Sequence, residues 1–147
     1  MPLNRPISAV VTWGKNFDNQ DAKRILVADG EAGSRELIRT VLENGGHAVT
    51  EARDGNRAVW IARETRLDLI LLDLRMPALD GFGALEQLRG EPRFTGLPIV
   101  ALTACAIEDD RAEALAAGFT SYISKPVRVA ELRIKLAYLL PWPAANA

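Results

Sequence analysis

From residue 24 onward, short apolar runs alternate with longer segments in which apolar residues recur every three or four positions. The alternation repeats five times along the chain. A run of roughly four to eight apolar residues is typical of a buried strand, whereas the longer period is typical of a helix with one buried face. The pattern therefore predicts βαβ units and a parallel sheet covered by helices. We expect strands at 24–28, 47–52, 68–73, 97–103 and 121–125, and helices at 34–45, 55–66, 81–90, 108–118 and 128–140.

The apolar positions within each helical segment predict which side of the helix faces the sheet. The strand at 68–73 is apolar on both faces and should be central, whereas the strand at 47–52 is more polar. The expected inward residues are Leu37, Ile38, Val41 and Leu42 in the first helix, Ala58, Val59 and Ala62 in the second, and Val129, Leu132, Leu136, Leu139 and Leu140 in the last.

The composition is that of one soluble globular domain. The chain has 147 residues, of which 48% are hydrophobic and 25% charged, and its formal net charge is −1. This charge gives no field that would draw the chain to nucleic acid or to an anionic membrane. No uncharged stretch reaches the ~18 residues of a membrane span. The single cysteine, Cys105, excludes an intrachain disulfide, which fits a cytoplasmic protein. We expect no direct nucleic-acid partner and no membrane partner.

The same pattern divides the chain into three parts. Residues 1–22 lack a clear period and are expected to form an N-terminal extension, residues 23–140 the folded domain, and residues 141–147 a short tail. Only six residues follow Pro141. We therefore expect no output domain in this chain and expect its output to pass through a partner.

Polar residues follow four of the expected strands, namely Asp29, Asp73, Thr103 and Lys125. Parallel strands joined by right-handed crossovers have their carboxyl ends at one edge of the sheet, and open α/β sheets bind ligands there. Two carboxylates suit Mg²⁺. A cation, an ammonium and a hydroxyl around one carboxylate can together hold a phosphoryl group, with Asp73 as the nucleophile.

Four longer motifs occur in order: ILVADGE at 25–31, DLILLDLRMPALDG at 68–81, PIVALTA at 98–104 and YISKP at 122–126. With these motifs the sequence resembles the receiver domain of two-component response regulators, from residue 24 to about residue 140. The resemblance implies a flavodoxin-like α/β fold, a three-layer (βα)5 sandwich whose five parallel strands lie in the order 2-1-3-4-5. It also implies a single-domain response regulator that receives a phosphoryl group, not a turnover enzyme.

By the same resemblance, Asp73 would accept the phosphoryl group from a sensor histidine kinase or a histidine phosphotransfer protein, with Mg²⁺ bound. The metal ligands would be Asp29, Asp73 and the backbone carbonyl of Arg75. The implied phosphate-binding residues are Thr103, Ala104 and Lys125, and the peptide bond from Lys125 to Pro126 would be cis.

The resemblance further implies a switch in which Thr103 moves toward the phosphoryl group and the ring of Tyr122 follows. This change would remodel the face formed by the helix at 108–118, the strand at 121–125 and the helix at 128–140. A downstream protein would read that face, and a homodimer is also compatible with the sequence.

Gly30 departs from the pattern of receiver domains, which usually have two adjacent acids after the first strand and use the second to touch the metal. Three consequences compete. Asp29 turns in with Asp73 and the Arg75 carbonyl to hold Mg²⁺ more weakly, or Glu31 reaches back through an unusual loop. Alternatively, the site has lost its metal and the chain is a phosphorylation-independent interaction scaffold. The otherwise complete set of site residues favours a working phosphoacceptor.

Two enzyme classes of similar topology fit the residues poorly. A flavin-binding protein needs a phosphate-binding loop after the first strand, where Asp29 and Glu31 would instead repel an anion. A phosphatase with an aspartate nucleophile needs a general acid two residues later, where Arg75 stands. The only histidine, His47, begins an expected strand and is interpreted as a surface residue.

Overall fold

The computed structural model describes residues 22–104 and 108–140. Within these residues, five strands form one parallel sheet in the order β2-β1-β3-β4-β5. The expected flavodoxin-like α/β fold and strand order are therefore confirmed. The strands are β1 (Arg24–Ala28), β2 (Ala48–Ala52), β3 (Leu69–Asp73), β4 (Ile99–Thr103) and β5 (Ser121–Ser124). The helices are α2 (Ala32–Asn44), α3 (Gly55–Glu64), α4 (Gly81–Arg89), α5 (Glu108–Ala117) and α6 (Val129–Leu139), with a 3₁₀ turn η2 (Pro92–Phe94) after α4.

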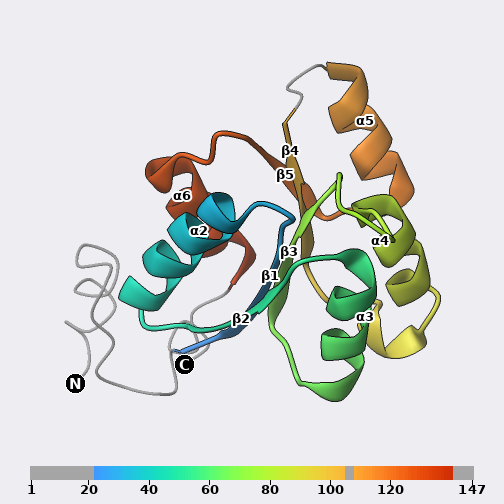
Figure 1. Ribbon diagram of the computed structural model, residues 1–147, viewed down its shortest axis with the longest axis horizontal. Coiled ribbons are helices and arrows are strands. Elements are labelled where there is room, and N and C mark those ends of the chain that lie inside the picture. The colour runs from blue at the N-terminus through green and yellow to red at the C-terminus, as the bar shows by residue number, and fades with distance from the viewer. Residues whose placement is uncertain (1–21, 105–107, 141–147) are drawn as a thin grey trace.

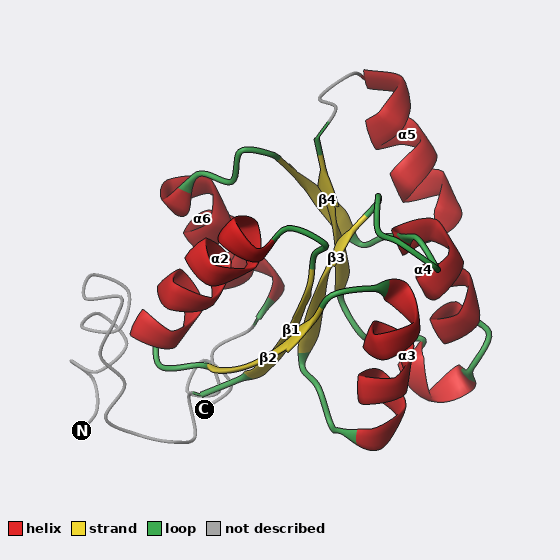
Figure 2. Cartoon of the chain, in the orientation of Figure 1, coloured by secondary structure: helices red, strands yellow, loops and turns green. Residues whose placement is uncertain are grey.

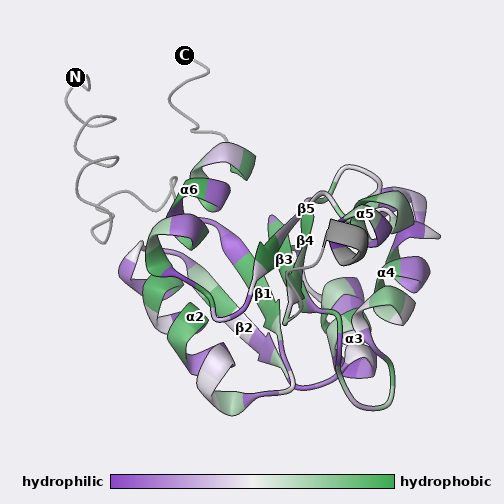
Figure 3. Cartoon of the chain, turned by 90° about the horizontal axis from the view of Figure 1, so that it is seen from above, coloured by the Kyte–Doolittle hydropathy of each residue, from purple (hydrophilic) through white to green (hydrophobic). Residues whose placement is uncertain are grey.

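The molecule has three layers. Helices α2 and α6 cover one face of the sheet, and α3, α4 and α5 cover the other (Figures 1 and 2). Each face has its own hydrophobic cluster, because the side chains of a strand alternate between the two faces. All residues of β3 and β4 are buried, as expected for strands with helices on both sides. Figure 3 shows the hydrophobic residues gathered in these central strands.

The amino end of α4 packs tightly on the carboxyl end of β3. Asp80 caps this helix, since its Oδ1 accepts a hydrogen bond from the Gly83 amide at 2.8 Å. The amide of Gly81 donates to the carbonyl of Leu74 at 3.1 Å. A Cβ on Gly81 would overlap the backbone carbonyl of Asp73, so only glycine allows this close approach. The helix therefore fixes the backbone at the end of β3.

Two of the predictions for inward-facing residues are wrong. Leu37 is 44% exposed and Val129 is 37% exposed. The buried residues of α2 are Ile38, Val41 and Leu42, and Leu37, one residue before Ile38, lies outside this buried face. Val129 is the first residue of α6, one turn before the buried Leu132. The inward positions predicted for α3 are buried, and those at the end of α6 are half-buried against the same cluster.

Several expectations fall outside the described residues. They concern Cys105, the tail at 141–147 and all but the last residue of the N-terminal extension. Among the residues that the structure describes, no helix is long and apolar enough to cross a membrane.

Candidate functional site

Two acids and a lysine meet at the carboxyl edge of the sheet. The Nζ atom of Lys125 lies 2.9 Å from Oδ2 of Asp29 and 3.0 Å from Oδ2 of Asp73. Asp29 is fully buried, Asp73 is 5% exposed, and the Lys125 side chain is 11% exposed. The structure thus brings together three of the four strand-end residues that the sequence singled out.

Strand alternation explains why these three side chains share one side of the sheet. Ile25 and Val27 of β1 belong to the cluster beneath α2 and α6, and Asp29 continues that alternation two residues later. The same period carries β3 from Leu71 to Asp73, and it carries β5 from a buried isoleucine to the lysine that follows the strand. Consequently the ammonium and both carboxylates lie over one helical layer.

The backbone orients both carboxylates. Oδ1 of Asp29 accepts a hydrogen bond from the amide of Glu31 at 2.8 Å. Oδ1 of Asp73 accepts one from the amide of Arg75 at 3.1 Å. Each acid therefore uses one oxygen to close a short turn and directs the other toward Lys125. The Lys125–Pro126 peptide bond is cis, as expected from the resemblance.

The pKa values of the three groups shift in different directions. Burial raises the pKa of Asp73; the Arg75 amide and Lys125 oppose the shift, and the charge of Asp29 adds to it. Burial also acts to raise the pKa of Asp29, but the Glu31 amide and Lys125 outweigh it and leave this pKa below its usual value. Burial would lower the pKa of Lys125, yet the two carboxylates hold it above its usual value. One ammonium therefore compensates Asp29 well and leaves the charge of Asp73 less compensated.

Glu31 lies at the rim of this cluster. Its Oε1 is 3.3 Å from Nζ of Lys125, and its side chain is 74% exposed. The sequence predicts that Glu31 would need an unusual loop to reach the metal; what the structure shows is its contact with Lys125. Glu31 has an ordinary extended backbone (φ −97°, ψ 123°) as the N-cap residue of α2. A side chain in this conformation at the start of the helix reaches the lysine directly.

The backbone does not require glycine at position 30. A Cβ there would lie 3.5 Å from Cδ of Pro77 and 3.9 Å from the carbonyl oxygen of Arg53, which are ordinary contacts. In the described part of the chain, the glycines with positive φ are Gly46 and Gly118. The backbone would therefore accommodate an acid at position 30, so the conformation of the chain does not explain why glycine stands there.

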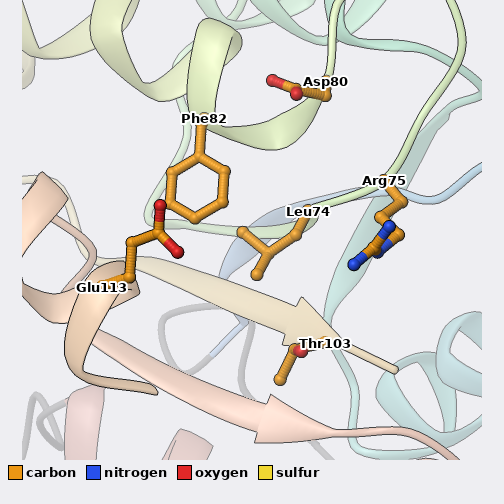
Figure 4. Close-up of a pocket in the computed structure, with 6 residues that line it drawn as sticks. All are labelled: Leu74, Arg75, Asp80, Phe82, Thr103 and Glu113. Atoms are coloured by element: carbon orange, nitrogen blue, oxygen red, sulfur yellow. The ribbon is translucent and has the colours of Figure 1, made fainter. Parts of the chain in front are cut away.

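The Thr103 side chain lies on the opposite side of the sheet from Asp29, Asp73 and Lys125. It is 4% exposed and alternates with Ala101, which packs beneath α3, α4 and α5. Thr103 lines a cleft of about 230 Å³ together with Leu74 and Arg75, the two residues that follow Asp73. In Figure 4, Glu113 lies beside Phe82 at one end of the cleft, and Arg75 lies beyond Leu74 at the other. Ala104, the next residue along the chain, is exposed.

Tyr122 lies on the same side of the sheet as Thr103. Its partner in the register of β4 and β5 is Ala101, two residues before Thr103. The ring contacts two cations, with Cζ of Arg111 at 5.1 Å and Nζ of Lys135 at 4.8 Å from its centroid. Tyr122 thus joins α5, β5 and α6 at the surface that the resemblance implies for signalling.

Sequence reasoning missed the remaining residues of the cleft. Asp80 carried a local signal, since aspartate is a favoured N-cap residue directly before a helical segment. Phe82 and Glu113 carried none, because they meet only when α4 and α5 pack side by side. A cleft between helices depends on that packing and not on a motif.

The donor set suits a hard divalent cation. Among the described residues, the buried Oδ2 of Asp29 accepts no hydrogen bond of good geometry and forms an ion pair with Lys125. No three acidic, histidine or cysteine side chains in the described chain gather closely enough to hold a metal by themselves. Asp29 and Asp73 therefore offer two carboxylates, and backbone oxygen and water would have to supply the other ligands. Mg²⁺ accepts this kind of set, since it usually binds one or two carboxylates and keeps several waters.

Comparison with known proteins identifies the family. A model of the response regulator receiver domain matches residues 25–137. The chain belongs to this family. Receiver domains are the signalling domains of two-component systems.

Two curated relatives of this receiver domain differ in length. An uncharacterized 14.6 kDa protein of Leptolyngbya boryana is 39% identical over 120 residues, which cover 81% of this chain and 92% of that protein. The transcriptional regulatory protein ResD of Bacillus subtilis is 40% identical over 124 residues, or 84% of this chain and 50% of ResD. The chain thus spans about half the length of a regulator such as ResD.

Two solved structures share the receiver fold. The receiver domain of a sensor histidine kinase from Pseudomonas aeruginosa, described with a magnesium ion in its active-site cleft, has a TM-score of 0.75 and 36% identity. It aligns with 81% of this chain and 98% of its own. The receiver domain of Ssk1 from Saccharomyces cerevisiae, crystallised with the histidine phosphotransfer protein Ypd1, has a TM-score of 0.77 and 28% identity, covering 82% and 90% of the two chains.

Proposed function

We propose that this receiver domain accepts a phosphoryl group on Asp73 from the phosphohistidine of a kinase or phosphotransfer protein. The observation that carries the proposal is the buried Asp73 carboxylate, held 3.0 Å from the ammonium of Lys125. A carboxylate oxygen of Asp73 attacks phosphorus while the bond from phosphorus to the donor atom breaks. The donor takes that electron pair, and an acyl phosphate forms on Asp73.

Phosphoryl transfer depends mainly on positioning and on neutralising the phosphoryl oxygens. Lys125 is placed to pair with one of these oxygens, and the amide of Arg75 fixes the Asp73 carboxylate during the attack. The Thr103 hydroxyl and the backbone of the exposed Ala104 border the space on the other side. Bound Mg²⁺, held by Asp29, Asp73 and the Arg75 carbonyl, would neutralise further negative charge on the phosphoryl group.

The switch and the output surface follow from Thr103 and Tyr122. Movement of the Thr103 hydroxyl toward the phosphoryl group would open space along β4 on the side where Tyr122 lies. The Tyr122 ring is held by cations from α5 and α6, so its movement would change both helices at once. A downstream protein would read this α5–β5–α6 face.

The family relatives support this class of partners. The receiver domain of Ssk1 forms a co-crystal with a histidine phosphotransfer protein, and ResD is a transcriptional regulatory protein. The part shared with ResD is about half of that protein. For this chain we propose a phosphotransfer donor and a protein target.

A second candidate is a scaffold that works without phosphorylation. Gly30 favours it, because the acid that usually touches the metal is missing there. In this case Lys125 would serve only to neutralise Asp29 and Asp73.

Intact-mass measurement separates the two candidates. The chain is incubated with acetyl phosphate and Mg²⁺, with an Asp73→Asn variant treated in parallel. If Asp73 is phosphorylated, the wild-type chain should gain the mass of one phosphoryl group and the variant should gain none. The wild-type chain should also gain none when EDTA replaces Mg²⁺. An unchanged wild-type mass, under conditions that phosphorylate another receiver domain, would refute the phosphoacceptor function and favour the scaffold.

A further inference from the structure

The position of Glu31 bears directly on the missing acid. Position 30 has no side chain, yet three carboxylates still approach the ammonium of Lys125. Asp29 and Asp73 do so from buried positions, and Glu31 does so from the exposed start of α2. The third negative charge of the site is therefore present, one residue later in the chain than expected.

We propose that Glu31 replaces the missing acid at position 30 and supplies the third negative charge of the divalent-cation site. This inference rests on the proposed Mg²⁺-dependent function and assigns a residue to it. Because Glu31 contacts the same Nζ atom as the two buried acids, a cation near those acids lies within the range of its charge.

The exposure of Glu31 indicates how it would act. In the described residues, no three acidic side chains are close enough to chelate a metal together, so Glu31 does not close a three-carboxylate cage. Its carboxylate is 74% exposed and remains hydrated. Mg²⁺ keeps several of its waters in proteins, and a hydrated carboxylate at the rim can accept hydrogen bonds from them. Glu31 would thus act on a bound cation through one of its waters, while the buried acids would supply direct ligands.

The local structure makes this inference testable by substitution. Within the described residues, the Glu31 side chain makes no hydrogen bond that caps α2, so replacing it removes no helix cap. Glu36 offers a matched control, since it is exposed on the same helix and carries the same charge. Gly30 has room for a Cβ with only ordinary contacts, so an acid can be restored there.

The experiment is a calorimetric Mg²⁺ titration of the full chain and four variants. We expect Glu31→Gln to weaken Mg²⁺ binding about three- to tenfold, and Glu36→Gln to change it by less than about twofold, because distant exposed charges are screened. Gly30→Asp should tighten binding about tenfold by restoring a direct carboxylate. In the Gly30→Asp background, Glu31→Gln should lose most of its effect, because residue 30 then supplies the charge.

The possible outcomes separate this inference from the proposed function. Wild-type binding with equal affinities for Glu31→Gln and Glu36→Gln would overturn the role of Glu31 and leave the phosphoacceptor proposal intact. An unchanged effect of Glu31→Gln in the Gly30→Asp background would also overturn it, since the two acids would not be interchangeable. If the wild-type chain binds no Mg²⁺, both this inference and the magnesium dependence of the proposed function fail.

Discussion

Replacing Lys125 by methionine tests the electrostatics of the site. The substitution keeps much of the volume and removes the ammonium that lies 2.9 Å from Asp29 and 3.0 Å from Asp73. Two carboxylates, one fully buried and one 5% exposed, are then left together without a positive charge. The folded state must then either keep two repelling charges away from water or take up protons. Either change lowers the free energy of unfolding.

The magnitude follows from the burial of the three groups. Removing one partner of a buried ion pair costs about 3–5 kcal/mol. We expect about 3 kcal/mol at pH 7, because the site lies at the edge of the sheet and Glu31 at its rim is exposed. For a domain of this size that corresponds to a fall in Tm of roughly 10 °C.

The stability lost in Lys125→Met should depend on pH in a characteristic way. Without Lys125, the pKa values of both carboxyl groups rise in the folded state, while those in the unfolded chain stay near their usual value of about 4. The folded variant then binds protons that the unfolded chain does not, so its deficit should be large at pH 7 and shrink as the pH falls toward about 5.

The measurement is thermal and urea unfolding of wild type and variant between about pH 5 and pH 8, without divalent cations. Lys135→Met is the matched control, since the Lys135 ammonium donates to the neutral hydroxyl of Ser121 at 2.9 Å. It should cost no more than about 1 kcal/mol and show no comparable pH dependence. A Lys125→Met loss as small as that of the control, or one independent of pH, would refute the reasoning.

Three further predictions concern stability. Ala78 has a φ of 67° in the loop after β3, a conformation that favours glycine, so Ala78→Gly should stabilise the protein by about 0.5–1 kcal/mol. The control Ala112→Gly, on the exposed side of α5, should destabilise it by about 1 kcal/mol. Equal effects of the two substitutions in urea unfolding would contradict this. Nη1 of Arg89 donates to the backbone carbonyls of Phe94, Thr95 and Leu97 after α4, at 2.7, 3.4 and 2.9 Å. Arg89→Met should therefore lower the free energy of unfolding by about 2 kcal/mol, and a loss below about 0.5 kcal/mol would be inconsistent with a stabilising role of these hydrogen bonds. Burial lowers the pKa of His47, whose Nδ1 accepts a backbone amide at 3.1 Å, so stability should fall as the pH drops below about 6.5; His47→Gln should flatten the Tm profile between about pH 7.5 and 5.5, and an unchanged slope would exclude this histidine as its cause.

The fold was predictable from the sequence because its pattern is repetitive and local. Strand and helix periods alternate, and polar residues mark the carboxyl ends of the strands. The same reasoning located Asp29, Asp73 and Lys125, since parallel strands must end at one edge. It failed at Leu37, because Leu37 and Ile38 are adjacent apolar residues that both fit the helical period, and the period alone does not show that only Ile38 faces the core.

The rest of the site depends on distances that no sequence period encodes. The sequence raised an approach of Glu31 as one of three alternatives but could not decide among them, because the 3.3 Å contact between Glu31 and Lys125 depends on how the turn after β1 is placed. Arg89 carried no motif, although it joins the segment after α4 to the carbonyl of Gly118. His47 was interpreted as a surface residue, yet its ring is partly buried and accepts the Lys23 amide. These are contacts between segments far apart in the chain.

Locating the phosphoryl group tests the central claim most directly. Borohydride reduces an aspartyl phosphate to homoserine with release of phosphate, so it marks the modified residue permanently. After treatment with acetyl phosphate, Mg²⁺ and borohydride, peptide mass spectrometry should find homoserine at position 73 and aspartate still at position 29. Homoserine at another position, or none in a chain that has gained a phosphoryl group, would contradict the assignment of Asp73 as the phosphoacceptor.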